Sequence, residues 1–173
     1  MSPLEIKSLI LDVPDFPKAG IVFKDITPVL ANPVAFNAVT ELLAQHAARM
    51  TCDAVLAIES RGFIIGAPLA QRLQLPLHLV RKRGKLPRAA ITVRYELEYG
   101  FDHLELHSDA IRRGGRYLIV DDVIATGGTA AAVASVVAQQ GATVAACLFL
   151  IELKFLAGRK KLGDVPVVSL ITY

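Results

Sequence analysis

Short runs of consecutive hydrophobic residues alternate along this chain with segments in which hydrophobic residues recur at helical spacing. The apolar runs predict buried strands at residues 54–58, 76–80, 117–120, 143–151 and 165–170. The spaced segments predict helices at residues 4–11, 33–50, 63–73 and 129–140. Because strands that are apolar on both faces must be covered on both faces, the alternation predicts an α/β fold. Its central, mostly parallel β-sheet would be flanked by helices on both faces.

Local signals mark where some of these elements begin and end. Asn32 followed by Pro33 is typical of a helix start, since asparagine caps free amides and proline fits the first turn. Gly141 is a natural C-terminal cap for the last predicted helix. Helix 63–73 is expected to bury Ile64, Ala67, Leu69 and Leu73.

Two segments depart from the alternation of strands and helices. Residues 12–23 are predicted to form an ordered loop, because they contain Pro14, Pro17 and Gly20. Residues 82–115 show period-two character and are interpreted as an antiparallel excursion, or a mobile hood, outside the core. No repeat or linker divides the chain, so residues 1–173 are expected to form a single domain.

The hydrophobic content, 53% of residues, raises the alternative of a membrane span. Residues 124–151 contain no charged side chain and are long enough to cross a bilayer. However, polar and glycine residues interrupt this stretch at 126–129 and 139–141, and no signal peptide is visible. Cys52 and Cys147 lie far apart without metal or redox spacing. We therefore expect a cytoplasmic protein with reduced thiols and no membrane partner.

The formal net charge of +3 is less informative than the distribution of charges. A basic patch without any acid comprises Arg81, Lys82, Arg83, Lys85 and Arg88. Without these residues the chain would be mildly acidic. A solvated turn is the simplest interpretation of such a patch. Its place just after a predicted parallel strand favours instead a compact polyanion such as phosphate, and not nucleic acid.

The strongest chemical signal is the segment 117–129, with the sequence YLIVDDVIATGGT. A buried strand leads into Asp121 and Asp122, and a loop of small residues then leads into a helix. Backbone amides at a helix N-terminus bind phosphate, and small residues let the phosphate approach. Paired acids beside a phosphate suit a ligand that also carries hydroxyl donors, such as a ribose phosphate. The simpler alternative is a strand-to-helix turn capped by an acid.

This segment resembles the phosphoribosyl pyrophosphate signature of the type I phosphoribosyltransferases. Further blocks resemble the adenine-specific members of that family, in the family's order and over nearly the whole chain. They are DFPKAGIVFKDI at 15–26, ESRGF at 59–63, VRKRGKLP at 80–87, LEYG at 97–100 and SLITY at 169–173. The resemblance implies transfer of a phosphoribosyl group from phosphoribosyl pyrophosphate to adenine, giving AMP and pyrophosphate, with Mg²⁺ and in a homodimer.

The resemblance also implies roles for individual residues. Asp121 and Asp122 would hold the ribose hydroxyls and stabilise an oxocarbenium-like sugar. The 5-phosphate would be bound by Ala125, Thr126, Gly127, Gly128 and Thr129. The pyrophosphate would be bound by Ser60, Arg61, Gly62, Arg81, Lys82 and Lys85. A cis peptide bond is expected between Glu59 and Ser60, whereas the Glu59 side chain has no expected chemical role. Arg81 or Lys85 could serve a neighbouring subunit.

For adenine the resemblance implies an apolar slot with hydrogen bonds to the base edge. Phe23 and Leu153 would form its walls, Val22 and Lys24 would offer backbone groups, and Val123 would contribute. Glu98 would accept or position the imidazole proton of the base, and Tyr99 would help to seal the site. Two alternatives stay open: transfer to a 6-oxopurine, and a non-catalytic regulator that binds phosphoribosyl pyrophosphate.

Overall fold

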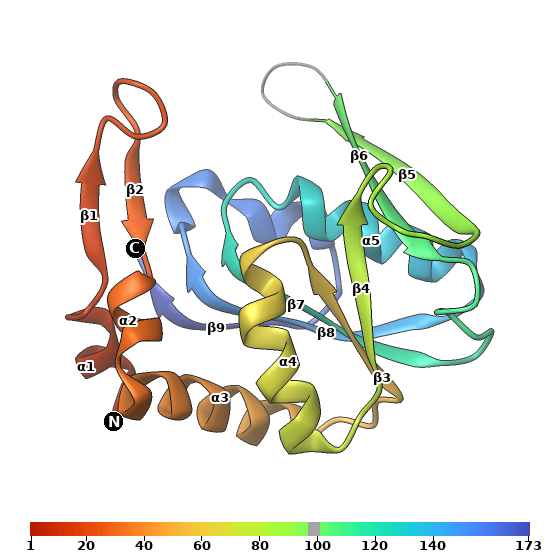
Figure 1. Cartoon of the computed structure of the whole chain (residues 1–173), viewed down its shortest axis with the longest axis horizontal. Coiled ribbons are helices and arrows are strands. Elements are labelled where there is room, and N and C mark those ends of the chain that lie inside the picture. The colour runs from red at the N-terminus through yellow and green to blue at the C-terminus, as the bar shows by residue number, and fades with distance from the viewer. Residues whose placement is uncertain (97–100) are drawn as a thin grey trace.

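A β-sheet runs through the middle of the protein in the computed structural model, which describes residues 1–96 and 101–173 (Figure 1). Its strands are β3 (Ala54–Ile58), β4 (Leu77–Lys82), β5 (Ala90–Glu96), β6 (Phe101–His107), β7 (Arg116–Ile124), β8 (Thr143–Glu152) and β9 (Val167–Thr172). The strand order is β5-β6-β4-β3-β7-β8-β9. The strands from β4 to β9 in that order are parallel, and β6 and β5 are antiparallel additions at one edge. The predicted α/β fold with a mostly parallel sheet is confirmed.

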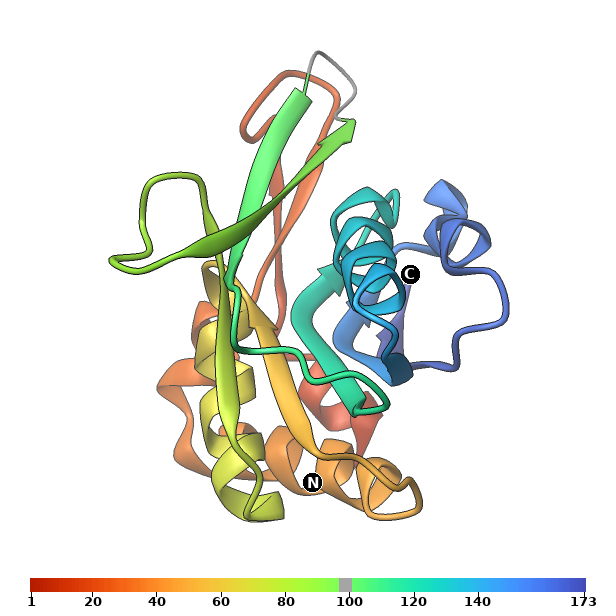
Figure 2. The same ribbon diagram turned by 90° about the vertical axis from the view of Figure 1, so that its right-hand side faces the viewer.

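Helices cover both faces of the sheet (Figure 2). α3 (Pro33–Ala47) and α4 (Arg61–Leu73) lie on one face, and α5 (Gly128–Gln139) lies on the other. Two 3₁₀ helices, η1 (Lys154–Leu156) and η2 (Gly158–Leu162), lie on the same side as α5. Successive residues of β7 point to opposite faces, so Leu118 joins the core beneath α3 and α4 while Ile119 joins the core beneath α5. Both faces are apolar for this reason.

The predicted caps are confirmed. The Asn32 Oδ1 atom accepts hydrogen bonds from the amides of Val34 and Ala35, at 3.0 and 3.1 Å, and so begins α3. α5 is followed by Gly141 with φ +70°, a conformation that glycine adopts without strain.

The predicted buried face of α4 is wrong at two positions. Ile64 and Ala67 are exposed, whereas Leu69 is buried as expected. The physical reason is Gly66, because a Cβ atom there would lie 2.6 Å from Cβ of Ala57. Gly66 lets α4 approach β3 closely. The face of α4 that carries Gly66 therefore points toward the sheet.

The N-terminal region differs from the prediction in two ways. The helix predicted over 4–11 is shorter, α1 (Pro3–Lys7). Residues 12–23 are not simply a loop, because β1 (Leu11–Pro14) and β2 (Val22–Asp25) pair as an antiparallel hairpin. Backbone pairing offsets the turn-forming residues, which are confined mainly to the tip. A short helix, α2 (Thr27–Ala31), follows the hairpin.

The segment 82–115 does form an antiparallel excursion, but part of it belongs to the core. β6 pairs with β4, and Leu104 and Leu106 are buried. The expectation that this segment lies outside the core is therefore wrong for β6. We call the pair β5–β6 the hood hairpin.

The uncharged stretch 124–151 is divided between the end of β7, a loop, α5 and most of β8. Among the described residues, no helix is both long and apolar enough to cross a bilayer.

Candidate active site

A cavity of about 480 Å³ opens where β7 leads into α5. Most of the residues predicted to bind the phosphoribosyl group and pyrophosphate line it, namely Ser60, Arg61, Lys82, Asp121, Asp122, Ala125, Thr126, Gly127, Gly128 and Thr129. The cavity lies at the carboxyl ends of β3 and β7, where parallel α/β sheets commonly bind ligands. The sheet thus brings together residues from three separate sequence blocks, 59–63, 80–87 and 117–129.

The two acids lie within β7, which continues past them to Ile124 and so extends beyond the predicted strand. Asp122 is only 4% exposed and forms an ion pair with Arg61, with 2.5 Å between Oδ2 and Nε. Asp121 accepts a hydrogen bond from the Asp122 amide at 2.8 Å. Burial, together with the neighbouring charge of Asp122, raises the pKa of Asp121 well above its ordinary value. The Asp121 carboxylate is therefore a destabilised anion that favours hydroxyl donors or positive charge beside it.

The loop between β7 and α5 is shaped by close backbone contact with η2. Gly127 is the N-cap residue of α5 and has φ +75°. A Cβ atom on Gly127 would lie 2.2 Å from the Gly158 carbonyl oxygen, and one on Gly158 would lie 2.3 Å from the Ala125 carbonyl oxygen. The α5 dipole and free amides favour an anion at this position. We call residues 125–129 the phosphate loop. Gly158 was missed in the sequence, where nothing local distinguishes it.

The segment joining β3 to α4 has the predicted cis peptide bond between Glu59 and Ser60. In this segment Arg61 occupies the first position of α4, beside Asp122. Gly62 does not line the cavity, but a Cβ atom there would lie 2.8 Å from the Val120 carbonyl oxygen and 2.9 Å from Oδ1 of Asp121. Gly62 thereby lets the start of α4 approach β7.

The basic patch does not act as one group in this structure. Lys82 lines the cavity, whereas Arg81 forms an ion pair with Glu59 at 3.2 Å and Arg88 pairs with Asp109 at 2.8 Å. The Arg81 guanidinium also donates to the Lys85 carbonyl oxygen at 3.2 Å. Burial opposes ionisation of Glu59, but hydrogen bonds from the Lys82 amide and Arg81 outweigh it and lower its pKa. Glu59 thus orients the Lys82 backbone amide and the Arg81 side chain.

The residues predicted to bind adenine lie outside the lining of this cavity, apart from Val123. Phe23 is nevertheless next to it, because the Arg61 guanidinium lies 5.0 Å from the centre of its ring. Val22 is exposed, and Lys24 forms an ion pair with Asp12 at 2.6 Å. The Leu153 amide donates to the Ile124 carbonyl oxygen at 3.0 Å, which fixes Leu153 at the end of β7.

Glu98 and Tyr99 lie outside the described residues. The adjoining hood hairpin contributes a residue that the sequence reasoning did not select, Tyr95, which lines the cavity together with Leu104. Its hydroxyl donates to Oδ2 of Asp102 at 3.2 Å, and Asp102 also lies 3.8 Å from the Lys82 ammonium. Burial and the Asp102 carboxylate raise the pKa of Tyr95 to about 12. The period-two pattern of this strand was the signal that could have found it.

Comparison with known proteins agrees with this geometry. A family model described as phosphoribosyl transferase domain matches residues 25–169. The adenine phosphoribosyltransferase of Carboxydothermus hydrogenoformans is 52% identical over 98% of this chain and 100% of its own length. A protein of the same name from Synechococcus sp. is 57% identical over 94% of each chain.

Solved structures show the same relationship. The crystal structure of adenine phosphoribosyltransferase from Thermoanaerobacter pseudethanolicus is 50% identical, with a TM-score of 0.97 over 99% of this chain and 100% of that one. The Saccharomyces cerevisiae enzyme, complexed with an imino-altritol bisphosphate and adenine, is 40% identical, with a TM-score of 0.90 over 97% of each chain. With matches of this extent, the chain belongs to the type I phosphoribosyltransferases and, within them, to the adenine phosphoribosyltransferase family.

Proposed function

We propose that the protein transfers the 5-phosphoribosyl group of phosphoribosyl pyrophosphate to adenine and releases AMP and pyrophosphate. The observation that carries the proposal is the single cavity in which Asp121, Asp122, Arg61 and the phosphate loop meet. Family membership supports the chemistry, and the names of the relatives support adenine as the acceptor.

The phosphate loop binds the 5-phosphate through backbone amides at the start of α5 and through the hydroxyls of Thr126 and Thr129. This contact holds the sugar beside β7. Asp121 and Asp122 accept hydrogen bonds from the ribose hydroxyls. As the bond to pyrophosphate lengthens, positive charge develops on the sugar, and the Asp121 carboxylate stabilises it. Burial and the neighbouring charge of Asp122 raise the pKa of Asp121, so positive charge that develops beside this carboxylate stabilises its ionised form.

The leaving pyrophosphate takes up negative charge, which Arg61, Lys82 and the amides near Ser60 stabilise. Arg81 and Lys85 complete this side of the site. Among the described residues, no cluster of three or more His, Cys, Asp or Glu side chains could hold a metal ion. We propose that Mg²⁺ is held mainly by substrate oxygens, as is common for this ion, with Asp121 and Asp122 as the nearby carboxylates. When bound, Mg²⁺ neutralises charge on the leaving group.

The acceptor base lies against Phe23 and Leu153, and Val123 contributes to the apolar slot. Backbone groups of Val22 and Lys24 read its edge. Glu98 accepts or positions the imidazole proton, and Tyr99 excludes water from the activated sugar. The Glu98→Gln variant is expected to lose turnover by roughly 100-fold or more, as removal of a general base commonly does. Turnover near that of the original protein would remove Glu98 from the mechanism.

One assay tests the function. The protein is mixed with phosphoribosyl pyrophosphate, Mg²⁺ and one purine base at a time, and nucleotide is measured by chromatography. AMP from adenine is the expected product. Product from guanine or hypoxanthine but not adenine would establish the 6-oxopurine alternative, and binding of phosphoribosyl pyrophosphate without any product would favour the regulator.

We further propose that the protein works as a homodimer in the cytoplasm. The hairpin β1–β2 and the turn at its tip expose the apolar side chains of Leu11, Phe16, Ile21 and Val22, which a second copy could cover. Cys52 and Cys147 are free, which suits a reducing compartment. Sedimentation velocity tests the dimer, because a monomer at micromolar concentration would exclude it.

A further inference from the structure

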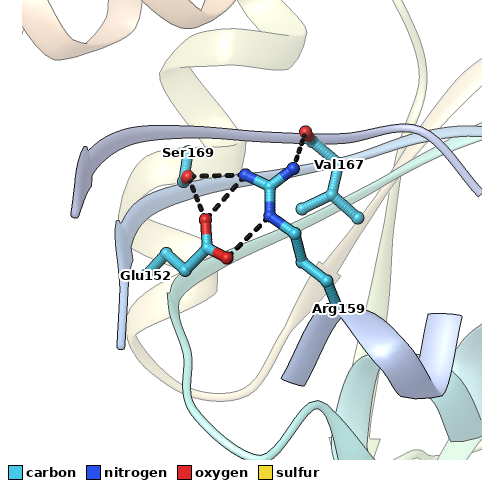
Figure 3. Close-up of polar contacts among 4 residues, drawn as sticks. All are labelled: Glu152, Arg159, Val167 and Ser169. Atoms are coloured by element: carbon cyan, nitrogen blue, oxygen red, sulfur yellow. Dashed lines mark hydrogen bonds and ion pairs between the residues drawn. The ribbon is translucent and has the colours of Figure 1, made fainter. Parts of the chain in front are cut away.

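The end of β8 carries a polar cluster outside the cavity (Figure 3). The Arg159 guanidinium donates from Nε to Oε1 and from Nη2 to Oε2 of Glu152, both at 2.6 Å. It also donates from Nη1 to the Val167 carbonyl oxygen at 2.8 Å and from Nη2 to Oγ of Ser169 at 2.9 Å. The Ser169 hydroxyl donates to Oε2 of Glu152 at 2.6 Å. We call these four residues the Arg159 clamp.

The clamp joins three elements. Glu152 ends β8, Arg159 lies in η2, and Val167 and Ser169 belong to β9. The ladder between β8 and β9 already pairs these strands at five positions without the side chains. What the clamp adds is the attachment of η2 to the sheet. The paired geometry matters because the Glu152 side chain is only 7% exposed, and a buried carboxylate needs partners.

The attachment of η2 bears on the phosphate loop. Arg159 follows Gly158 directly, and a Cβ atom on Gly158 would lie 2.3 Å from the Ala125 carbonyl oxygen and 2.9 Å from the Gly127 amide nitrogen. The backbone of η2 therefore forms the back wall of the loop. A shift of Gly158 by a fraction of an ångström would move the amides that bind the 5-phosphate.

The same attachment bears on the predicted base wall. Leu153 follows Glu152 and donates its amide to Ile124 at 3.0 Å, while the Lys154 amide donates to the Tyr173 carbonyl oxygen at 2.9 Å. Residues 153–158 thus connect the predicted base wall to the phosphate loop. The residues on either side of this segment, Glu152 and Arg159, are joined by their ion pair.

We propose that Arg159 and Glu152 are positioning residues, which hold segment 153–158 so that the phosphate loop and Leu153 are both in register for their ligands. The role of Leu153 rests on the proposed function, whereas the role of the phosphate loop rests on family membership. Neither clamp residue touches substrate.

The decisive variant is Arg159→Met, which keeps the length of the side chain and removes all of its donors. The dissociation constant for ribose 5-phosphate is measured by calorimetry, and KM is measured for phosphoribosyl pyrophosphate and for adenine. All three are expected to rise by roughly 10- to 100-fold, the cost of a small misplacement of binding groups. The matched control is Arg72→Met, which removes the ion pair between Arg72 and Glu41 on α4 and α3 and should leave all three constants unchanged.

A purely structural clamp would give a different result. The unfolding temperature of Arg159→Met would fall, but the three constants would stay unchanged at temperatures where the variant is folded, and that result overturns the proposal. A rise in the ribose 5-phosphate constant with an unchanged adenine KM would equally overturn the joint positioning. If Arg159→Met does not fold, Ser169→Ala and Arg159→Lys decide, with smaller shifts expected in the same direction.

Failure of the proposed function would look different again. A protein that makes no AMP from adenine overturns that function, yet its binding of ribose 5-phosphate still reports on the clamp.

Discussion

Two acidic residues near the carboxyl ends of neighbouring strands have opposite surroundings. Asp121 of β7 lies beside a second carboxylate, Asp122, and burial together with that charge raises its pKa. Glu152 of β8 lies beside Arg159, whose hydrogen bonds lower its pKa in spite of burial. The two strands are paired side by side in the sheet. The protein destabilises the ionised form of Asp121, whereas it stabilises the ionised form of Glu152.

This contrast separates two roles at one end of the sheet, ligand binding and structural support. An acid left without a sufficient counter-charge is ready for a ligand that brings hydroxyl groups or positive charge. An acid whose charge is already balanced by a bidentate arginine gains little from a ligand, and its main effect is to hold the groups that it binds in place. Stability and activity should therefore respond in opposite directions at Asp121 and in the same direction at Glu152.

The largest effect is expected for Asp121→Asn. Asparagine keeps the oxygen that accepts the Asp122 amide hydrogen bond but removes the charge that we propose stabilises the transition state, so kcat should fall by roughly 100-fold or more. The folded protein holds a proton on Asp121 to higher pH than the unfolded chain does, so its unfolding free energy falls as pH rises above 3.8 toward the raised pKa. The variant lacks this loss and should have the higher unfolding temperature at neutral pH.

Calorimetric unfolding at neutral pH and steady-state kinetics check both halves of that prediction. A variant that loses both activity and stability would show that Asp121 is a structural acid like Glu152, and the contrast would disappear.

The sequence made one side of this contrast predictable. Asp121, Asp122 and the phosphate loop are contiguous, so a strand, an acid pair and a run of small residues already imply a site for a sugar phosphate. The clamp could not be predicted in this way, because the pairing of Glu152, Arg159 and Ser169 depends on how η2 returns to the sheet. Gly158 carries no local signal for the same reason.

The errors in the predicted fold have similar causes. Hydrophobic spacing favoured Ile64 and Ala67 as the buried face of α4, but Gly66 decides that face by allowing contact with Ala57. Leu104 and Leu106 were assigned to an excursion, and only the pairing of β6 with β4 brings them into the core. Local pattern predicts the elements well, whereas close approach and edge pairing depend on the assembled fold.

A smaller effect, on stability, is expected for Glu152→Gln. Glutamine keeps an acceptor but turns an amide toward Arg159, so the unfolding free energy at neutral pH should fall by about 1–3 kcal/mol. Because the pKa of Glu152 is lowered when folded, its contribution is complete above the ordinary value of 4.5 and is lost as pH falls through the lowered pKa. The difference between the two proteins should therefore narrow in acid.

Urea unfolding over a pH series measures this difference. A constant difference from neutral pH into acid would mean that the charge of Glu152 does not stabilise the fold, and the clamp would then depend on shape alone.

The smallest effect is expected for Tyr95→Phe. This variant tests whether the hood hairpin contributes to ligand binding, like Asp121, or to stability, like Glu152. Tyr95 lines the cavity, but its hydroxyl already donates a hydrogen bond to Oδ2 of Asp102 at 3.2 Å. Removing one shared hydrogen bond should raise KM for phosphoribosyl pyrophosphate by roughly 2- to 10-fold. The pH profile should be unchanged near neutrality, because a pKa of about 12 keeps the phenol protonated there. An altered profile would mean that Tyr95 titrates during turnover. An unchanged KM with a lower unfolding temperature would instead show that Tyr95 stabilises the fold and does not affect ligand binding.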